Sequence, residues 1–203
     1  RFQVGLVFQY PEYQLFEETV YKDIAFGPRN MGLDEADIDR RVRSAAAFVG
    51  LTEAMLDKSP FELSGGQKRR VAIAGVVAMD PDYLVLDEPS AGLDPRSRNA
   101  VFKEIMALHQ SRNIAIVLVT HSMEEAAKYA QRLLVINKGQ VLFDGRPADI
   151  FRSHQQELVA VGMDEPQVFK LADLLRSRGL QLPQGIADEV TLLQMIKKAK
   201  GWR

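Results

Sequence analysis

Hydrophobic and polar positions along this chain form two alternating kinds of segment. Continuous apolar runs, which are typical of buried strands, occur at residues 4–8, 83–86 and 114–119. Between these runs, apolar residues recur every three or four positions, which is the spacing of a helix with one buried face. Strands that alternate with helices in this way predict a mainly parallel sheet that helices cover on both faces.

Capping and breaking residues place the first helices. Residues 19–26 fit a short helix that Gly27-Pro28 should stop. Asp34 can cap a second helix over residues 34–49. The apolar face of that second helix is made by Ile38, Val42, Ala45, Ala46 and Val49.

Three further helix starts carry local signals. Ser64 and Gln67 have the spacing of a capping box, in which a side chain and a backbone group bond reciprocally. Asp94-Pro95 places a capping residue before a proline, which suits the first helical position. Ser122 and Glu125 repeat the capping-box spacing. Each pattern predicts a helix that begins directly after the capping residue.

The last third of the chain changes character. Residues 133–136 and 140–143 flank Asn137-Lys138-Gly139, which predicts a β-hairpin. After about Pro147 no strong strand pattern remains. Amphipathic helices are predicted at 167–178 and 187–200, separated by a loop around Pro183 and Gly185. We interpret this region as a small helical appendage.

Composition narrows the class of protein. The 203 residues, 46% hydrophobic and 26% charged, are ordinary for a globular protein with one core. A net charge of −1 gives no general attraction to nucleic acid or to an anionic membrane. The absence of cysteine excludes disulfides and thiolate zinc sites. The longest apolar run, from Val71 to Met79, is far shorter than the roughly 20 residues that cross a bilayer.

Asp87 and Glu88 follow directly after the apolar strand at 83–86. In open α/β sheets, side chains at the carboxyl end of a strand face the crevice where ligands bind. Nucleotide hydrolysis needs Mg²⁺ to neutralise phosphate charge and a group that orients the attacking water. Asp87 is placed for the metal and Glu88 for the water. Taken alone, the pair could equally be two solvated loop acids.

Ser64-Gly65-Gly66-Gln67 opens a helix. Free N–H groups and the helix dipole at such a start suit an anion, and glycines let a phosphate approach closely. A simple cap explains Ser64 and Gln67 but not two successive glycines, which would weaken a purely structural helix start. We therefore predict that this segment contacts a phosphate.

Three other polar side chains stand at strand or helix ends. His121 follows the strand at 114–119, at the sheet edge where Asp87 lies, and a neutral imidazole can exchange hydrogen bonds near a γ-phosphate. The amide of Gln9, at the end of the first strand, can contact a metal-bound water. Asp94 needs no role beyond capping, although a second role at a subunit interface is open. Each signal is weak alone.

Together these motifs resemble the ATPase subunit of an ABC transporter. Five segments occur in the order typical of that family: Phe8-Gln9 is similar to the Q-loop, Leu63–Gln67 to the signature, Tyr83–Glu88 to Walker B, Ser90–Asp94 to the D-loop and Thr120-His121 to the H-loop. The resemblance implies two subunits that hold ATP and Mg²⁺ between them, head to tail.

The resemblance also implies roles for individual residues. Glu88, His121 and Gln9 would act in catalysis in cis, and Asp87 and Gln9 would hold Mg²⁺, the latter through water. The signature residues Ser64, Gly65, Gly66 and Gln67 would contact the ATP of the partner in trans, and Asp94 would act in the D-loop.

The implied fold is α/β, with the mainly parallel sheet of P-loop NTPases. Residues 1–147 would form the ATPase domain, with an inserted helical subdomain over about 17–80. Residues 148–203 would form a C-terminal helical extension.

A narrower resemblance is to the ATPases of energy-coupling factor importers. It rests on Gln9–Phe16, Asp23–Pro28 and Leu63–Gly75. It implies a peripheral subunit on the cytoplasmic face of the membrane that drives uptake of a vitamin or metal ion. Its partners would be a second ATPase subunit, in a homodimer or a heterodimer, a transmembrane coupling subunit and a substrate-binding membrane subunit. The last of these would determine the cargo, and no nucleic acid is implied.

Two groups of apolar side chains can be interpreted either as binding surfaces or as parts of the chain's own core. Tyr10, Tyr13 and Phe16 could line a groove for a helix of the membrane subunit, or they could belong to the local core. Lys68-Arg69-Arg70 is expected to be a solvated helix face. Six apolar residues of the appendage could pair two ATPases or pack on the chain's own core: Leu171, Leu174, Leu175, Leu192, Leu193 and Ile196.

One family feature does not occur in these 203 residues: the G-x-x-x-x-G-K-[ST] loop, expected a few dozen residues before Gln9. Because catalysis depends on a positioned substrate, we expect this polypeptide alone to bind ATP poorly and to hydrolyse none measurably. We expect it to be part of a longer ATPase, since Arg1 is not a natural start.

Two alternative functions are compatible with parts of the sequence. One is a non-catalytic partner that offers its signature to the ATP of another subunit. The other is an ABC ATPase of DNA maintenance, which is disfavoured because the segment from Gln9 to Ser64 is short, no heptads are sustained and cysteine is absent.

Overall fold

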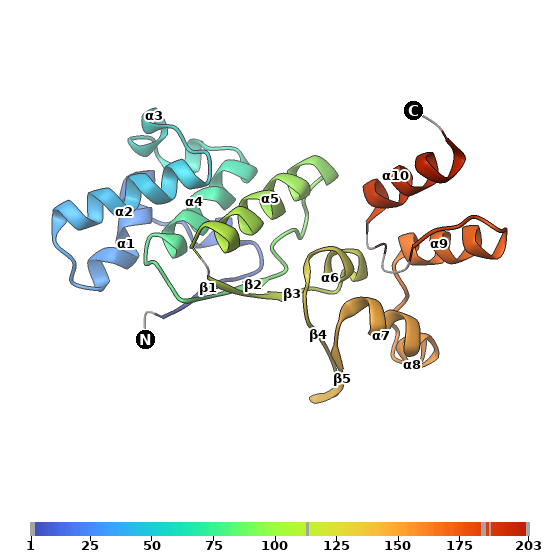
Figure 1. The fold of residues 1–203 in the computed structure, drawn as a ribbon. Helices are drawn as coiled ribbons and strands as arrows, with labels where there is room; N and C mark the ends of the chain where they lie inside the picture. The colour runs from blue at the N-terminus through green and yellow to red at the C-terminus, as the bar shows by residue number, and fades with distance from the viewer. Residues whose placement is uncertain (1–2, 113, 184–185, 187, 202–203) are drawn as a thin grey trace. The chain divides into compact units, whose positions relative to one another are not determined.

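The chain forms two compact units in a computed structural model, residues 1–119 and residues 120–203 (Figure 1). The structure describes residues 3–112, 114–183, 186 and 188–201. Arg1, Gly185 and Ala187, on which sequence-based predictions fell, lie outside these ranges. The predicted boundary near residue 147 lies inside the second unit, and the division into an ATPase domain and an extension stays a prediction.

A three-stranded parallel sheet, in the order β1-β2-β3, is the centre of the first unit. Its strands are β1 (Val4–Val7), β2 (Tyr83–Asp87) and β3 (Ala115–Val119). The predicted parallel sheet is confirmed. Parallel strands require long connections, and here both connections contain helices.

Six helical segments lie between β1 and β2, and one lies between β2 and β3. They are η1 (Pro11–Gln14), α1 (Val20–Asn30), α2 (Glu35–Phe48), α3 (Glu53–Leu56), η2 (Pro60–Glu62), α4 (Gly65–Val77) and, after β2, α5 (Pro95–Arg112). Helices α1, α2 and α4 pack on one another. The predicted cap of α2 is confirmed, since Asp34 Oδ1 accepts a hydrogen bond from the Asp37 N–H at 2.9 Å. The five apolar residues predicted for its inner face are all buried.

Helix α1 does not stop at Gly27-Pro28, as the sequence predicted, but runs to Asn30. Pro28 lies inside the helix, two residues before its end, and lacks the N–H that would bond to the carbonyl four residues earlier. Gly27 serves helix packing instead, because a Cβ atom there would lie 2.6 Å from Cγ of Met79. The glycine marks a close approach of α1 to the end of α4, not a helix break.

Helices cover the sheet on one face only within the described residues, so the prediction of two covered faces is wrong here. Gly5, Val7, Leu84 and Leu86 lie on the buried face, and α4 contacts β1. A Cβ atom on Gly5 would lie 2.5 Å from Cγ1 of Val76, so glycine is needed for this approach. The other face exposes Val4, Leu6, Tyr83, Val117 and Val119.

The second unit contains the predicted hairpin and a series of short helices. The elements are α6 (Met123–Tyr129), β4 (Leu133–Asn137), β5 (Gln140–Gly145), α7 (Pro147–Ser153), α8 (Gln155–Ala160), α9 (Gln167–Ser177) and α10 (Glu189–Lys200). Strands β4 and β5 pair antiparallel, and Lys138 and Gly139 between them both have positive φ. Two successive positive φ angles are typical of a type I′ hairpin turn. The hairpin prediction is confirmed.

Two small hydrophobic cores hold the second unit together. One lies between α6, β4, α7 and α8 and includes Phe151, which is fully buried. The other lies between α9 and α10 and includes Ala172 and Leu192. The six apolar residues of the appendage divide: Leu192 is buried and Leu175 and Ile196 pack beside it, whereas Leu171, Leu174 and Leu193 are about half exposed. The interpretation as packing on the chain's own core is confirmed for Leu175, Leu192 and Ile196. The pairing of two ATPases through the exposed residues stays a prediction.

Candidate active site

Three predicted site residues lie at one edge of the sheet, where strands β1 and β2 end. Val7 of β1 pairs with Leu86 of β2. Gln9 and Glu88, each two residues further along, therefore follow the carboxyl ends of neighbouring strands, with Asp87 as the last residue of β2. This is the edge at which open α/β sheets bind ligands. The three residues bring only carboxylate and amide groups to it.

The backbone at this edge adopts an uncommon conformation. Glu88 has φ of 47° and Tyr10, directly after Gln9, has φ of 55°. Non-glycine residues seldom occupy this left-handed region, and when they do they cluster at functional sites. The Glu88 N–H donates a hydrogen bond to the Val119 carbonyl at 2.9 Å, so β3 holds the chain as it turns away from β2. Nothing in the sequence indicated these two conformations.

The start of α4 is a capping box, as predicted. Ser64 Oγ accepts from the Gln67 N–H at 3.4 Å, and Gln67 Oε1 accepts from the Ser64 N–H at 3.0 Å. A Cβ atom added to Gly65 or Gly66 would meet no heavy atom within 4 Å. Packing inside the chain therefore does not require these glycines, and a ligand can approach the helix start.

Asp94 caps α5, which confirms that prediction. Its Oδ1 accepts from the N–H groups of Arg96 and Ser97 at 3.0 and 3.2 Å. Hydrogen bonds from the Ser97 side chain and backbone hold the pKa of the Asp94 carboxyl below its ordinary value. Two residues earlier, a Cβ atom on Gly92 would lie 3.4 Å from Cε1 of Tyr10. The D-loop-like segment therefore lies beside Tyr10, the residue directly after the Q-loop-like segment.

His121 lies at the start of the second unit, in a loop fixed by a buried carboxylate. Glu125 is 3% exposed and accepts a hydrogen bond from Thr120 Oγ1 at 2.9 Å. The Ser122 N–H donates to Thr120 Oγ1 at 3.0 Å, and Ser122 Oγ accepts from the Glu125 N–H at 3.3 Å. The capping spacing predicted for Ser122 and Glu125 is confirmed, and it fixes the backbone on both sides of His121.

Arg69 was predicted to be part of a solvated helix face, and for this residue the prediction is wrong. It is 1% exposed. Its Nε and Nη2 donate to the Glu12 carboxylate, each at 3.0 Å, and its Nη1 donates to the carbonyls of Pro89 and Ala91, each at 3.1 Å. The sequence did contain a signal. Ile73 and Val77 follow Arg69 at four-residue spacing, which is the buried stripe of α4.

A groove of about 330 Å³ lies in the first unit between η1, α1 and α4. Among the aromatic residues predicted to line it, Phe16 does so, in edge-to-face contact with Phe26. Tyr13 is instead 84% exposed. Asp23 also lines the groove and accepts from the N–H groups of Phe16 and Glu17 at 3.4 and 3.2 Å. Burial raises the pKa of the Asp23 carboxyl.

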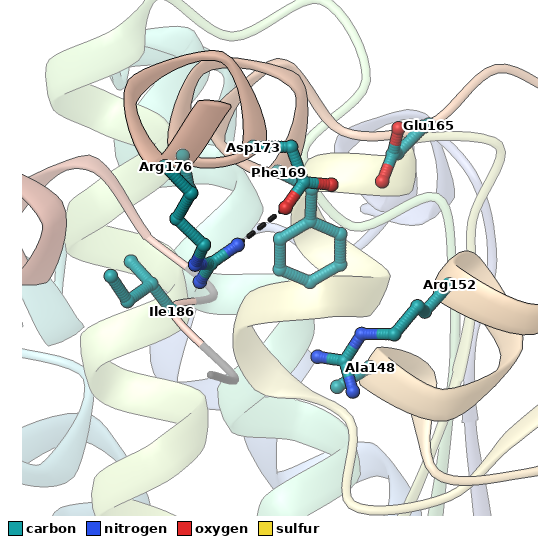
Figure 2. A pocket seen from close by; sticks show the side chains of 8 residues that line it. Ala148, Arg152, Glu165, Phe169, Asp173, Arg176 and Ile186 are labelled. Atoms are coloured by element: carbon teal, nitrogen blue, oxygen red, sulfur yellow. Dashed lines mark hydrogen bonds and ion pairs between the residues drawn. The ribbon is translucent and has the colours of Figure 1, made fainter. Parts of the chain in front are cut away.

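A second cavity lies in the second unit and is polar but small. Figure 2 shows Arg152, Glu165 and the ion pair between Arg176 and Asp173 around it. Its volume of about 20 Å³ has room for one water molecule. Burial raises the pKa of the Glu165 carboxyl, whose Oε2 accepts a hydrogen bond from Gln155. The cavity is therefore no candidate for a nucleotide site.

Comparison with known proteins defines the class. The family model described as ABC transporter matches residues 1–91. The structure of CbiO1 from Clostridium perfringens, described as part of the ABC transporter complex CbiONQ, superposes with a TM-score of 0.70 and 35% identity. The superposition covers 87% of this chain and 68% of that one. The fold is that of an ABC ATPase domain, a P-loop NTPase.

Curated relatives narrow the class to one family. The energy-coupling factor transporter ATP-binding protein EcfA2 of Clostridioides difficile is 52% identical over 99% of this chain and 70% of its own length. The EcfA2 proteins of Clostridium tetani and Bacillus subtilis are 55% and 54% identical over 92% and 84% of this chain. The chain belongs to the ATP-binding subunit family of energy-coupling factor transporters. It spans 65% and 61% of the length of these last two relatives.

Proposed function

We propose that this chain is part of the motor subunit of an energy-coupling factor importer, which couples ATP hydrolysis in a head-to-tail dimer to uptake of a vitamin or metal ion. The subunit would lie on the cytoplasmic face of the membrane. Family membership supports ATP binding, and no helix among the described residues is long and apolar enough to span a bilayer. The observation that carries the proposal is the common edge of Gln9, Asp87 and Glu88.

In this mechanism Glu88 orients the attacking water and accepts its proton as the bond from this water to the γ-phosphorus forms, while the bond from the γ-phosphorus to the bridging oxygen of ADP breaks and ADP is the leaving group. Gln9, at the end of the neighbouring strand, hydrogen-bonds the same water or a metal-bound one. His121 donates a hydrogen bond to the γ-phosphate from a loop that Glu125 fixes. The left-handed backbone of Glu88 turns the chain out of the sheet at the point where this carboxylate acts.

The donor groups at the edge fit Mg²⁺. Mg²⁺ prefers oxygen ligands and is held by one or two carboxylates together with waters and substrate phosphates. Asp87 offers one carboxylate and Gln9 one amide oxygen, and the described residues contain no group of three or more His, Cys, Asp or Glu that could hold a metal by itself. When bound, Mg²⁺ would neutralise phosphate charge. Asp87 and, through water, Gln9 would hold it.

The start of α4 would act on the ATP of the partner subunit. The open space beside Gly65 and Gly66 lets a phosphate reach the free N–H groups of the helix. Ser64 and Gln67 fix these groups through the capping box. Asp94 would lie at the same interface, where its capping role keeps the D-loop-like segment ordered.

The groove between η1, α1 and α4 would receive a helix of the transmembrane coupling subunit. Its walls are mainly apolar, with Phe16, Phe26 and Met79 beside the single carboxylate of Asp23. An amphipathic helix can bind such a groove through its apolar face. A second ATPase subunit and a substrate-binding membrane subunit would complete the assembly.

Replacement of Glu88 tests the proposal directly. In the assembled transporter, Glu88→Gln should lower ATP turnover by about 10²-fold or more, because loss of a general base typically costs that much. Glu35→Gln, which changes an exposed carboxylate on α2, should leave turnover unchanged.

The same series distinguishes a non-catalytic partner. If Glu88→Gln leaves turnover intact while Gly66→Ala lowers it, this chain only donates its signature to the ATP of another subunit. If neither substitution changes turnover, the proposed site is wrong.

A further inference from the structure

One guanidinium group joins three segments that are far apart in the sequence. Arg69 lies on α4, one turn after the signature-like start of that helix. Its Nε and Nη2 bond to Glu12 of η1, and its Nη1 bonds to the backbone on both sides of Ser90. Nη2 makes a further bond to the Ala91 carbonyl at 3.1 Å. The whole guanidinium is therefore engaged inside the protein.

The chemistry of this contact is specific to arginine. The planar fork of the guanidinium matches a carboxylate with two parallel bonds, and a lysine ammonium cannot make this arrangement. The Arg69 side chain is 2% exposed and that of Glu12 is 18% exposed. A buried pair of this kind is weak evidence for stability. Its geometry fixes the relative position of the groups that it joins.

The segments that Arg69 joins are those of the proposed reaction. The carbonyls of Pro89 and Ala91 belong to the backbone that leaves Glu88, so their position constrains the left-handed turn at Glu88. Glu12 lies three residues after Gln9, in the 3₁₀ helix whose end lines the groove. The ring of Tyr10 also lies near Gly92, since a Cβ atom added to that glycine would be 3.4 Å from Tyr10 Cε1, so the two segments are adjacent at this second point.

We propose that Arg69 is a positioning residue for ATP hydrolysis: through Glu12 and the carbonyls of Pro89 and Ala91, it holds the Q-loop-like segment and the backbone after Glu88 in register with the signature helix. The proposal rests on the proposed function, because the positioned group is Glu88. Arg69 does not touch the substrate in this mechanism.

The test is a double-mutant cycle in the full-length protein within its assembled complex. Arg69→Lys keeps the charge but loses the fork, and Glu12→Gln keeps the shape but loses the carboxylate. Asp80→Asn is the matched control, since it weakens an arginine–carboxylate pair of the same unit, Asp80 with Arg112 at 2.9 Å, that touches none of the three segments. The measurements are kcat, KM for ATP and the melting temperature.

We expect each substitution at Arg69 or Glu12 to lower kcat at least about tenfold while KM for ATP changes less than about threefold, the pattern of a group that acts on the transition state. The double variant should lose little more than either single variant, because both remove the same link. The control should keep wild-type kcat. Melting temperatures of the Arg69 and Glu12 variants should fall below that of the control, because removal of one partner leaves a buried group without its ion pair. The kcat is therefore measured at a temperature at which every variant is folded.

ATP turnover of the wild type and of Glu88→Gln is measured in the same series. A failure of the proposed ATPase function can therefore be distinguished from a failure of the proposed positioning role of Arg69. If those results hold but Arg69→Lys and Glu12→Gln keep kcat within about threefold of wild type, or lose it only in proportion to the unfolded fraction, the positioning role is wrong. If Arg69→Lys does not fold, the kcat of Glu12→Gln relative to wild type tests the positioning role by itself. If the wild-type complex hydrolyses no ATP, the proposed function itself is wrong.

Discussion

Single residues at the sheet edge combine chemical groups with an unusual backbone. Tyr10 and Glu88 are both in the left-handed region, and each directly follows a residue, Gln9 or Asp87, to which we assign a role. A left-handed L-residue costs free energy that surrounding contacts must offset. At Glu88 one such contact is the hydrogen bond to the Val119 carbonyl.

Asp23 gives a pH-dependent prediction at the scale of one residue. Burial raises the pKa of its carboxyl above the ordinary value of 3.8. A raised folded-state pKa means that the folded protein binds the proton more tightly than the unfolded chain. The stability contribution of Asp23 is therefore fully present below the ordinary pKa and is lost as the pH rises through the folded-state pKa.

The comparison of wild type with Asp23→Asn isolates this effect. The free energy of unfolding, measured in urea across acidic pH, should fall for wild type relative to the variant as the pH rises. Asp37→Asn is a control of opposite sign, because the hydrogen bond from Arg40 lowers the pKa of Asp37. For that pair the wild type should gain relative stability as the pH rises. Parallel curves for wild type and Asp23→Asn would contradict the prediction.

Helix α4 is the element in which stability and function are expected to conflict. Glycine inside a helix destabilises it by roughly 0.5–1 kcal/mol relative to alanine. Gly66 has no packing reason to be glycine, since an added Cβ would meet nothing within 4 Å. Gly66→Ala should therefore raise the free energy of unfolding, by no more than about that amount because Gly66 is in the first turn of the helix.

The same substitution should lower ATP turnover of the assembled transporter, because a methyl group at the helix start obstructs the approach of a phosphate. Ser64→Ala serves as the comparison, since it removes the cap and should lower stability by about 1 kcal/mol. Chemical unfolding and ATP turnover are measured on both variants. A Gly66→Ala protein that is more stable and fully active would show that the glycine is not needed for phosphate.

The elements that the sequence predicts well are those with local causes. The three strands, the hairpin and the caps at Asp34, Ser64, Asp94 and Ser122 all depend on residues within a few positions of one another. The prediction of the end of α1 is wrong because Gly27 is needed for close packing against Met79, which is about fifty positions away in the sequence.

The candidate site likewise has features that the sequence predicts and features that depend on distant residues. The common edge of Gln9, Asp87 and Glu88 follows from strand order, which motifs indicate. The four-residue spacing of Arg69 with Ile73 and Val77 indicates that Arg69 is buried. Its partners could not be predicted, because Glu12 is 57 positions away and the backbone carbonyl of Pro89 carries no sequence signal. The left-handed backbone at Glu88 depends on β3, which follows later in the chain.

At the scale of the whole molecule, the second unit exposes apolar side chains that its own cores do not use. Leu171 and Leu174 on α9 are 46% and 48% exposed, and Val190 and Leu193 on α10 are 63% and 55% exposed. The neighbouring Leu192 is buried. Helices α9 and α10 contact each other, and contiguous exposed apolar groups mark interaction sites. We therefore assign the exposed group, not the buried one, to the pairing of two ATPase subunits.

This assignment predicts that Leu171→Gln combined with Leu174→Gln weakens the dimer of the full-length protein at least about tenfold, as truncation of central interface residues does. The melting temperature should change little, because the two side chains are already about half exposed. Val159→Gln, at a 62% exposed residue of α8 in the same unit, is the matched control and should leave the dimer intact. Sedimentation equilibrium of the three proteins measures the dissociation constant, and a double variant that dimerises like the wild type would show that these leucines lie outside the interface.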